Sequence, residues 1–180
     1  MILILNGSPN KNSKTMNVTN RLLENNDSEI ALINAYKVDV ESCQDCKYCD
    51  HAIGCSKNDD MNDVYTKLYK ADTLIISSPI YFGALSDKLM TIINRFQRFY
   101  SQKFTLKQGS IPTFKNLILV STQGSDKARM FNGAKETLNI LDKLFEPEFI
   151  SEILIPSSDQ SPLLTSNDIE KINEIKKKMK

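Results

Sequence analysis

The sequence lacks several features that would point to common protein functions. It has one histidine, His51, and no Gly-x-Ser-x-Gly motif, which argues against a histidine-based hydrolase. The formal net charge is only +1, so the composition indicates neither a nucleic-acid partner nor an acidic membrane surface. No apolar run is long enough to span a bilayer, and repeats and low-complexity segments are absent. These absences favour an ordinary soluble globular protein.

The sequence also lacks signs of secretion. All four cysteines lie between Cys43 and Cys55, so they do not join distant parts of a secreted fold through disulfides. The N-terminal segment 1–5 has no basic leader and is too short for a signal peptide. We therefore expect a cytoplasmic protein. With 180 residues, 41% hydrophobic and 25% charged, the chain has the size of a single domain, residues 1–180.

Short apolar runs alternate with segments of helical periodicity. Continuous apolar runs predict strands buried on both faces, as in a parallel sheet covered by helices. The predicted strands are 2–5, 74–76 and 117–120, with more peripheral ones at 30–33 and 150–155. Apolar spacings of three and four predict helices between and after them. The helical stripes are Val18 and Leu22; Met61, Val64 and Leu68; Leu85, Leu89, Ile92, Phe96 and Phe99; Phe131, Ala134, Leu138, Leu141 and Phe145; and Ile169, Ile172 and Ile175.

Five strand–helix repeats of this kind predict an α/β fold. Its core would be a doubly wound five-stranded parallel sheet with helices on both faces. In such sheets ligands bind beyond the carboxyl ends of the strands. The loops that follow Leu5, Ile76 and Val120 are therefore the candidate binding loops.

The first of these loops is rich in hydroxyl and amide side chains and leads into a predicted helix. Unpaired N–H groups and a partial positive charge make a helix N-terminus suitable for a phosphate. The loop is not a P-loop, because Ser13 stands where a glycine should precede Lys14. Because the loop carries little charge, it suits a single phosphate monoester better than a triphosphate. The alternative interpretation is a Ser/Asn-rich turn that ends in an ordinary helix N-cap and binds no ligand. The side-chain donors are Ser8, Asn10, Asn12, Ser13 and Thr15.

The second and third loops suit a planar ligand. Tyr81 and Phe82 stand between Pro79, which fixes the backbone, and Gly83, which permits close approach. These aromatic rings can face a flat ring system, or they can simply cover the core or an oligomer interface. The third loop, 121–125, is another small polar loop with a glycine at the same predicted edge.

Together these segments resemble the NAD(P)H-dependent FMN reductase family of flavodoxin-like proteins. The resemblance covers roughly the first two-thirds of the chain, and its segments in order are far more specific than any one of them. The segments are Asn6–Pro9 with Ser13–Thr15, Asp59–Met61, and Ser78–Gly83. One departure is Asn94 before Arg95, where such proteins often carry Asp-Arg; this concerns a salt bridge or partner contact rather than flavin binding.

The resemblance implies a flavodoxin-like fold that binds FMN. The FMN phosphate would be held by Ser8, Asn10, Ser13 and Thr15, with Lys14 as a further cofactor-binding residue. The isoalloxazine ring would contact Pro79, Ile80, Tyr81, Phe82 and Gly83, with Thr122, Gln123 and Gly124 near its other edge.

The cysteines form a compact motif with two, two and five residues between them. Closely spaced thiolates can wrap an iron–sulfur cluster, whereas zinc sites more often use two separated pairs. The spacing also resembles that of iron–sulfur flavoproteins, which hold a [4Fe–4S] cluster beside FMN. The alternatives are zinc, free thiols or a reversible disulfide. The four candidate metal ligands are Cys43, Cys46, Cys49 and Cys55.

The resemblance implies an FMN-dependent oxidoreductase with NAD(P)H as co-substrate. Hydride would pass from the nicotinamide to FMN, and electrons would then pass to a quinone, a free flavin or another small acceptor. An iron–sulfur electron carrier and a non-catalytic flavin-binding regulatory or partner-binding protein are the alternatives. The aromatic residues Phe96, Phe99, Tyr100 and Phe104 exceed what one core stripe needs. We therefore expect a homodimer or higher homo-oligomer.

Overall fold

Five parallel strands form the centre of the structure, a computed structural model that describes residues 1–10, 12–160 and 163–179. Their spatial order is β2-β1-β3-β5-β6, the order of flavodoxin-like doubly wound sheets. The strands are β1 (Ile2–Asn6), β2 (Ile30–Asn34), β3 (Thr73–Tyr81), β5 (Asn116–Thr122) and β6 (Phe149–Ile155). The predicted fold class is therefore confirmed.

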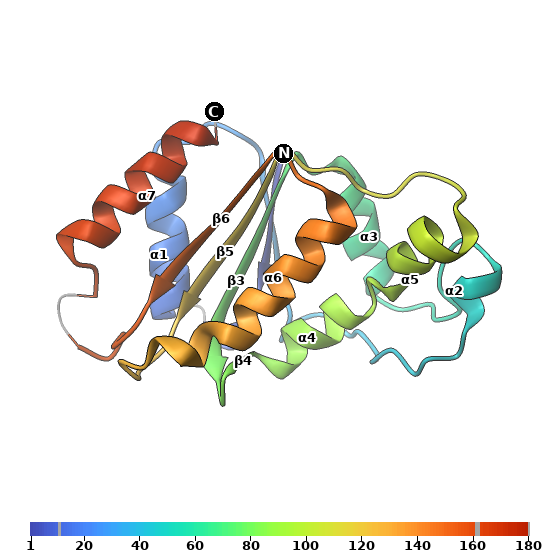
Figure 1. Ribbon diagram of the computed structural model, residues 1–180, viewed down its shortest axis with the longest axis horizontal. Coiled ribbons are helices and arrows are strands. Elements are labelled where there is room, and N and C mark those ends of the chain that lie inside the picture. Colours follow the sequence, from blue (N-terminus) through green and yellow to red (C-terminus); the bar gives the residue numbers. More distant parts are fainter. Residues whose placement is uncertain (11, 161–162, 180) are drawn as a thin grey trace.

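Two helical layers cover the sheet (Figure 1), because side chains alternate between its faces. In β1, Ile2 and Ile4 pack into a core with α1 and α7, whereas Leu3 and Leu5 face the opposite core. That opposite core is formed with α3, α4 and α6. The helices are α1 (Lys14–Leu23), α3 (Met61–Lys70), α4 (Asp87–Asn94), α6 (Asn132–Phe145) and α7 (Ser166–Lys178).

The remaining elements are short. They are α2 (Tyr48–His51), β4 (Ala84–Leu85), α5 (Gln97–Tyr100), the π-helix η1 (Ser101–Leu106) and the 3₁₀ helix η2 (Ala128–Phe131). Strand β4 pairs antiparallel with the end of β3, so the sheet has six strands where the sequence predicts five. Among the helices of the described ranges, none has the length and apolarity that a bilayer crossing requires.

The predicted helix through Leu85 and Phe99 consists of three elements in the structure. Leu85 lies in β4, and the chain tightens between α4 and α5, where Arg95 N–H donates to the Ile92 carbonyl at 3.0 Å, an i−3 bond. The stripe still points inward throughout, and its apolar side chains are buried. Phe96 and Phe99 contact Phe145 in this core, with ring centroids 5.7 and 5.9 Å apart.

Candidate functional site

The first predicted loop connects β1 to the N-terminus of α1. The Ser13 hydroxyl accepts a hydrogen bond from Met16 N–H at 3.1 Å, which makes Ser13 the N-cap of α1. The N–H groups of Lys14 and Thr15 lie in the first turn, where no intrahelical acceptor exists. Ser8 is buried, and its hydroxyl lies 3.3 Å from Asn10 N. Lys11, also in this loop, lies outside the described residues.

Hydroxyl contacts join this loop to the other strands of the sheet. The Thr15 and Thr122 hydroxyls are 2.6 Å apart, which connects the start of α1 to the end of β5. One turn further on, the Thr19 hydroxyl lies 2.8 Å from that of Ser77 in β3. The first and third predicted loops are therefore direct neighbours at one edge of the sheet.

A close approach of backbone and helix sets the path of the first loop. A Cβ atom on Gly7 would lie 2.5 Å from Ser86 Oγ and 2.8 Å from Leu89 Cβ. Only glycine lets β1 pass so near the start of α4. The Ser86 hydroxyl is buried here and has no hydrogen-bond partner among the described residues.

The predicted second loop is a β-hairpin. Pro79, Ile80 and Tyr81 belong to β3, and Phe82 and Gly83 form the two-residue turn to β4, with φ of +50° and +80°. Positive φ at both turn residues is the geometry of a type I′ turn, which joins two strands closely. The Phe82 ring is fully exposed at the tip, and Tyr81 is 48% exposed. The hairpin thus presents two aromatic rings at the same edge as the first predicted loop.

The third loop contains an unsatisfied buried acceptor. Gln123 is 5% exposed, and its amide N–H donates to the Lys127 carbonyl at 3.0 Å. Its Oε1 has no hydrogen-bond partner among the described residues. A buried carbonyl oxygen left unpaired costs roughly 1–3 kcal/mol, so a ligand N–H here would be stabilising. The loops therefore fit FMN on two points: a helix N-terminus for a phosphate, and a buried acceptor without a partner at the edge of the sheet where two aromatic rings are exposed.

Two further loops reach this edge, and sequence reasoning missed both. After β6, Asp159 accepts a hydrogen bond from Lys14 Nζ at 2.8 Å, and its carboxylate approaches so near Gly124 that a Cβ there would lie 2.4 Å away. After β2, the Tyr36 hydroxyl donates to Asp87 at 2.8 Å. Both loops follow predicted strands, so the carboxyl-end rule applied to all five strands would have found them.

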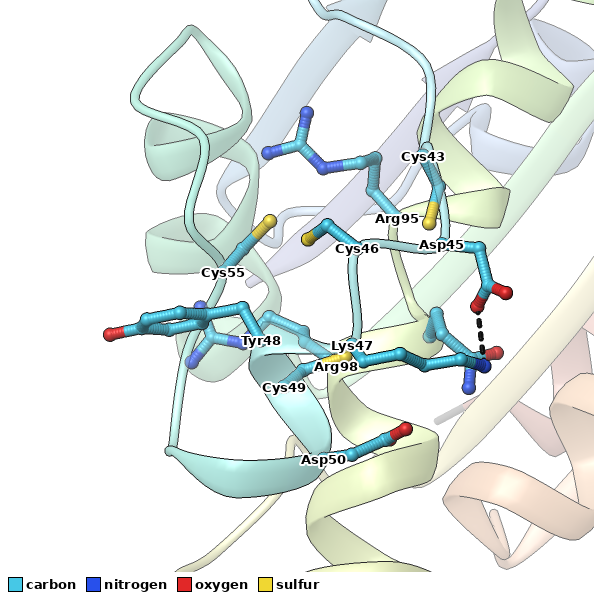
Figure 2. A pocket seen from close by; sticks show the side chains of 11 residues that line it. Cys43, Asp45, Cys46, Lys47, Tyr48, Cys49, Asp50, Cys55, Arg95 and Arg98 are labelled. Atoms are coloured by element: carbon cyan, nitrogen blue, oxygen red, sulfur yellow. Dashed lines mark ion pairs between the residues drawn. The ribbon is translucent and has the colours of Figure 1, made fainter.

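The four cysteines lie together on a different part of the molecule. All four line one pocket with α2 and with residues of the α4–α5 junction, among them Arg95 and Arg98 (Figure 2). The pocket holds about 30 Å³ of water-accessible space. Cys43 and Cys46 are exposed, whereas Cys49 and Cys55 are partly buried. The compact motif thus gathers its thiols in space as well as in sequence.

Two of the thiols in this pocket, those of Cys46 and Cys49, contact nearby hydroxyl groups. Cys46 lies 3.3 Å from the Ser56 hydroxyl, and this hydrogen bond lowers the pKa of the Cys46 thiol from its ordinary value. Cys49 donates to Ser101 Oγ at 3.5 Å, and the Ser101 hydroxyl donates to Asp50 at 2.5 Å. Ser101 is fully buried, and it links Cys49 to Asp50, which lines the same pocket.

Zinc sites and iron–sulfur clusters require different spacings of the cysteine thiolates. Among the described residues, no three His, Cys, Asp or Glu side chains are grouped so that they could hold one metal ion. Four thiolates on a single zinc must stand about 3.8 Å apart, as Zn–S bonds near 2.3 Å in a tetrahedron require. In a [4Fe–4S] cubane each cysteine binds a different iron, so the sulfurs stand farther apart. Four cysteines that line one pocket supply the number and kind of ligands that a [4Fe–4S] cluster takes from a protein.

A buried ion pair anchors the segment that carries the cysteines. Arg95 Nη1 donates to Asp59 at 2.7 Å and to the Glu41 carbonyl at 2.8 Å. Asp59 also accepts from the N–H groups of Glu41 and Met61. Burial opposes the charge on Asp59, but the Arg95 hydrogen bond and the backbone donors outweigh it and lower the pKa of this carboxyl. The departure at Asn94 therefore leaves Arg95 with an acidic partner, Asp59.

Comparison with known proteins identifies the family to which this chain is similar. A family model described as "NADPH-dependent FMN reductase" matches residues 1–145. An iron–sulfur flavoprotein of Archaeoglobus fulgidus is 29% identical over 96 residues, covering 52% of this chain and 47% of the relative. An iron–sulfur flavoprotein of Methanocaldococcus jannaschii is 26% identical over 110 residues, covering 59% of this chain and 56% of the relative. The chain thus spans about half the length of these curated relatives.

Solved structures share the whole fold at low sequence identity. An NAD(P)H:quinone oxidoreductase from Methanothermobacter marburgensis superposes with a TM-score of 0.75 at 14% identity, covering 99% of this chain and 98% of that one. An FMN-dependent NADH-azoreductase from Bacillus anthracis, solved with FMN, gives 0.69 at 16% identity, covering 99% and 98%. These likenesses establish the flavodoxin-like fold from end to end.

Proposed function

This chain belongs to the NADPH-dependent FMN reductase family, and we propose that it binds FMN and passes electrons from NAD(P)H to a small acceptor such as a quinone or a free flavin. The observation that carries the proposal is the convergence of three loops at one sheet edge. The Thr15–Thr122 contact joins the phosphate loop to the third loop, and the β3–β4 hairpin completes the set.

The chain's own residues would bind and orient the cofactor. The N-terminus of α1 and the hydroxyls of its loop would hold the phosphate, and Tyr81 and Phe82 would exclude water from the ring. The side-chain carbonyl oxygen of Gln123 would accept a ring N–H, which gives this buried oxygen a hydrogen-bond partner. FMN, when bound, supplies the hydride chemistry, so the protein needs no acid–base triad.

Calorimetric titration with FMN and with riboflavin tests the phosphate site. Two hydrogen bonds to a charged group, at about 1.5 kcal/mol each, give about 3 kcal/mol in favour of FMN. This corresponds to an affinity at least a hundredfold higher for FMN than for riboflavin. Equal affinities for the two would contradict the proposed site. Thr66→Val, on an exposed face of α3, is a control that leaves both affinities unchanged.

A second candidate function is electron transfer through an iron–sulfur cluster. The observation that favours it is the single pocket lined by Cys43, Cys46, Cys49 and Cys55. Two relatives named iron–sulfur flavoproteins support the same assignment. Chemical analysis of anaerobically purified protein should give four iron and four sulfide per chain, as a [4Fe–4S] cluster requires. Cys49→Ala should lose most of this iron, and flavin without iron in the wild type would exclude the cluster.

We also propose that the protein functions as a homodimer or higher homo-oligomer. Phe96 and Phe99 are buried in the core, so they give no support, but Tyr100 and Phe104 remain about half exposed with ring centroids 4.8 Å apart. The fully exposed Phe82 is a further apolar group that a second copy can cover. Sedimentation of a monomer at high protein concentration would refute this proposal.

A further inference from the structure

Two arginines of the cysteine pocket have buried N–H donors for which the described residues provide no hydrogen-bond acceptor. The Nε–H group of Arg95 and that of Arg98 are both buried and both lack a hydrogen-bond partner among the described residues. Both arginines line the pocket together with the four cysteines. Buried unpaired donors on a cation are costly, and an acceptor placed in this pocket removes that cost.

The two guanidinium groups are fixed in place by other contacts. Arg95 is 2% exposed and is held by the Asp59 carboxylate at 2.7 Å. The Arg98 guanidinium carbon lies 4.3 Å from the centroid of the Tyr65 ring and 5.1 Å from that of Phe99. Cation–π contacts of this kind hold the Arg98 guanidinium group against the aromatic core. The Nε–H groups are therefore presented by rigid side chains.

The charged side chains around the pocket balance one another, so a ligand is favoured by the unpaired donors and not by net charge. Asp45 and Lys47 neutralise one another at 2.7 Å, and Asp59 neutralises Arg95. Asp50 accepts from the neutral Ser101 hydroxyl and keeps its negative charge, and Arg98, which lies over an aromatic ring, is the positive charge that balances it. A [4Fe–4S] cluster with four thiolate ligands carries net negative charge and exposes sulfur atoms that accept N–H donors.

We infer that Arg95 and Arg98 donate their Nε–H groups to the sulfur atoms of a cluster bound by the four cysteines and thereby raise its reduction potential. The inference rests on the second proposed function. Reduction adds one electron to the cluster, so a neighbouring positive charge and N–H···S bonds stabilise the reduced form more than the oxidised one. Both arginines act on the potential and do not ligate iron.

The test is a potentiometric titration of the full-length protein after anaerobic reconstitution with ferrous iron and sulfide. Arg98→Gln removes the charge and the guanidinium donor, and should make reduction at least tenfold less favourable, which is 59 mV for a one-electron couple. Arg98→Lys keeps the charge without the Nε–H donor and should shift the potential in the same direction by less. Arg21→Gln, on the exposed surface of α1, is the matched control and should not change it.

Two results overturn the inference, and they can be told apart. A wild-type protein that takes up FMN but no iron after reconstitution refutes the cluster itself and this inference with it. A fully loaded cluster whose potential is the same in wild type and Arg98→Gln refutes only the role of the arginines. Arg95→Lys provides a second comparison, and iron analysis of each variant shows that the potentials refer to the same cluster.

Discussion

Removal of the Asp59 carboxylate should destabilise the protein strongly. The Arg95 side chain is 1% exposed and that of Asp59 is 9% exposed, so Asp59→Ala leaves a buried cation without its partner. Breaking a buried pair in this way costs about 3–5 kcal/mol. For a domain of this size each kcal/mol lowers Tm by about 2–4 °C, so the expected fall is about 6–20 °C. Urea unfolding followed by circular dichroism measures the free energy directly.

The same pair should give a pH signature. The pKa of Asp59 is lower in the folded state, so its contribution is complete above the unfolded pKa of about 3.9 and is lost as pH falls through the folded pKa. The stability difference between wild type and Asp59→Ala should therefore narrow below about pH 4. Asp63→Ala breaks only an exposed pair with Lys67 and should cost less than about 1 kcal/mol. If Asp59→Ala lowers the free energy of unfolding by no more than Asp63→Ala does, the buried ion pair does not contribute as proposed.

Three further perturbations probe the site and its supporting core. Gly7→Ala places a Cβ 2.5 Å from Ser86 Oγ and should cost about 1–3 kcal/mol in urea unfolding and weaken FMN binding by calorimetry; unchanged stability would contradict the packing. Ser13→Ala removes the cap of α1, which should cost about 0.5–2 kcal/mol and lower FMN affinity more than riboflavin affinity. Burial raises the pKa of Tyr65 to about 12, so stability should fall as pH rises above about 10. The difference in ultraviolet absorbance between wild type and Tyr65→Phe should show the Tyr65 hydroxyl ionising near pH 12. Ionisation of this hydroxyl near pH 10 in the folded protein would contradict the effect of burial.

The parallel sheet could be predicted because its strands are buried on both faces. Runs such as 117–120 are continuously apolar, a pattern that few other structures produce. Strand β4 could not be predicted, because two residues carry no periodicity and its turn depends on packing against α6. A Cβ on Gly133 of α6 would lie 2.4 Å from the Gly83 carbonyl, a contact between segments 50 residues apart in the sequence.

The candidate sites were predictable to different degrees. The first loop is continuous in sequence, so the start of α1 near Ser13 and Thr15 could be predicted from local pattern, and their binding of a phosphate stays a prediction. The spacing of the cysteines was equally visible in the sequence, but the charged side chains that surround the cysteines in the folded protein were not. Arg98 reaches the pocket from about 50 residues further along the chain. Such contacts depend on the packing of α5 against the cysteine segment, which no local signal specifies.

The absorption spectrum of anaerobically purified protein, before and after addition of NADPH, tests the central proposal most directly. A two-banded flavin spectrum that bleaches at once on addition of NADPH is the predicted result. A flavin spectrum that persists with NADPH would instead indicate a flavin-binding protein without this activity. A colourless protein that also takes up no added FMN would contradict the proposed function.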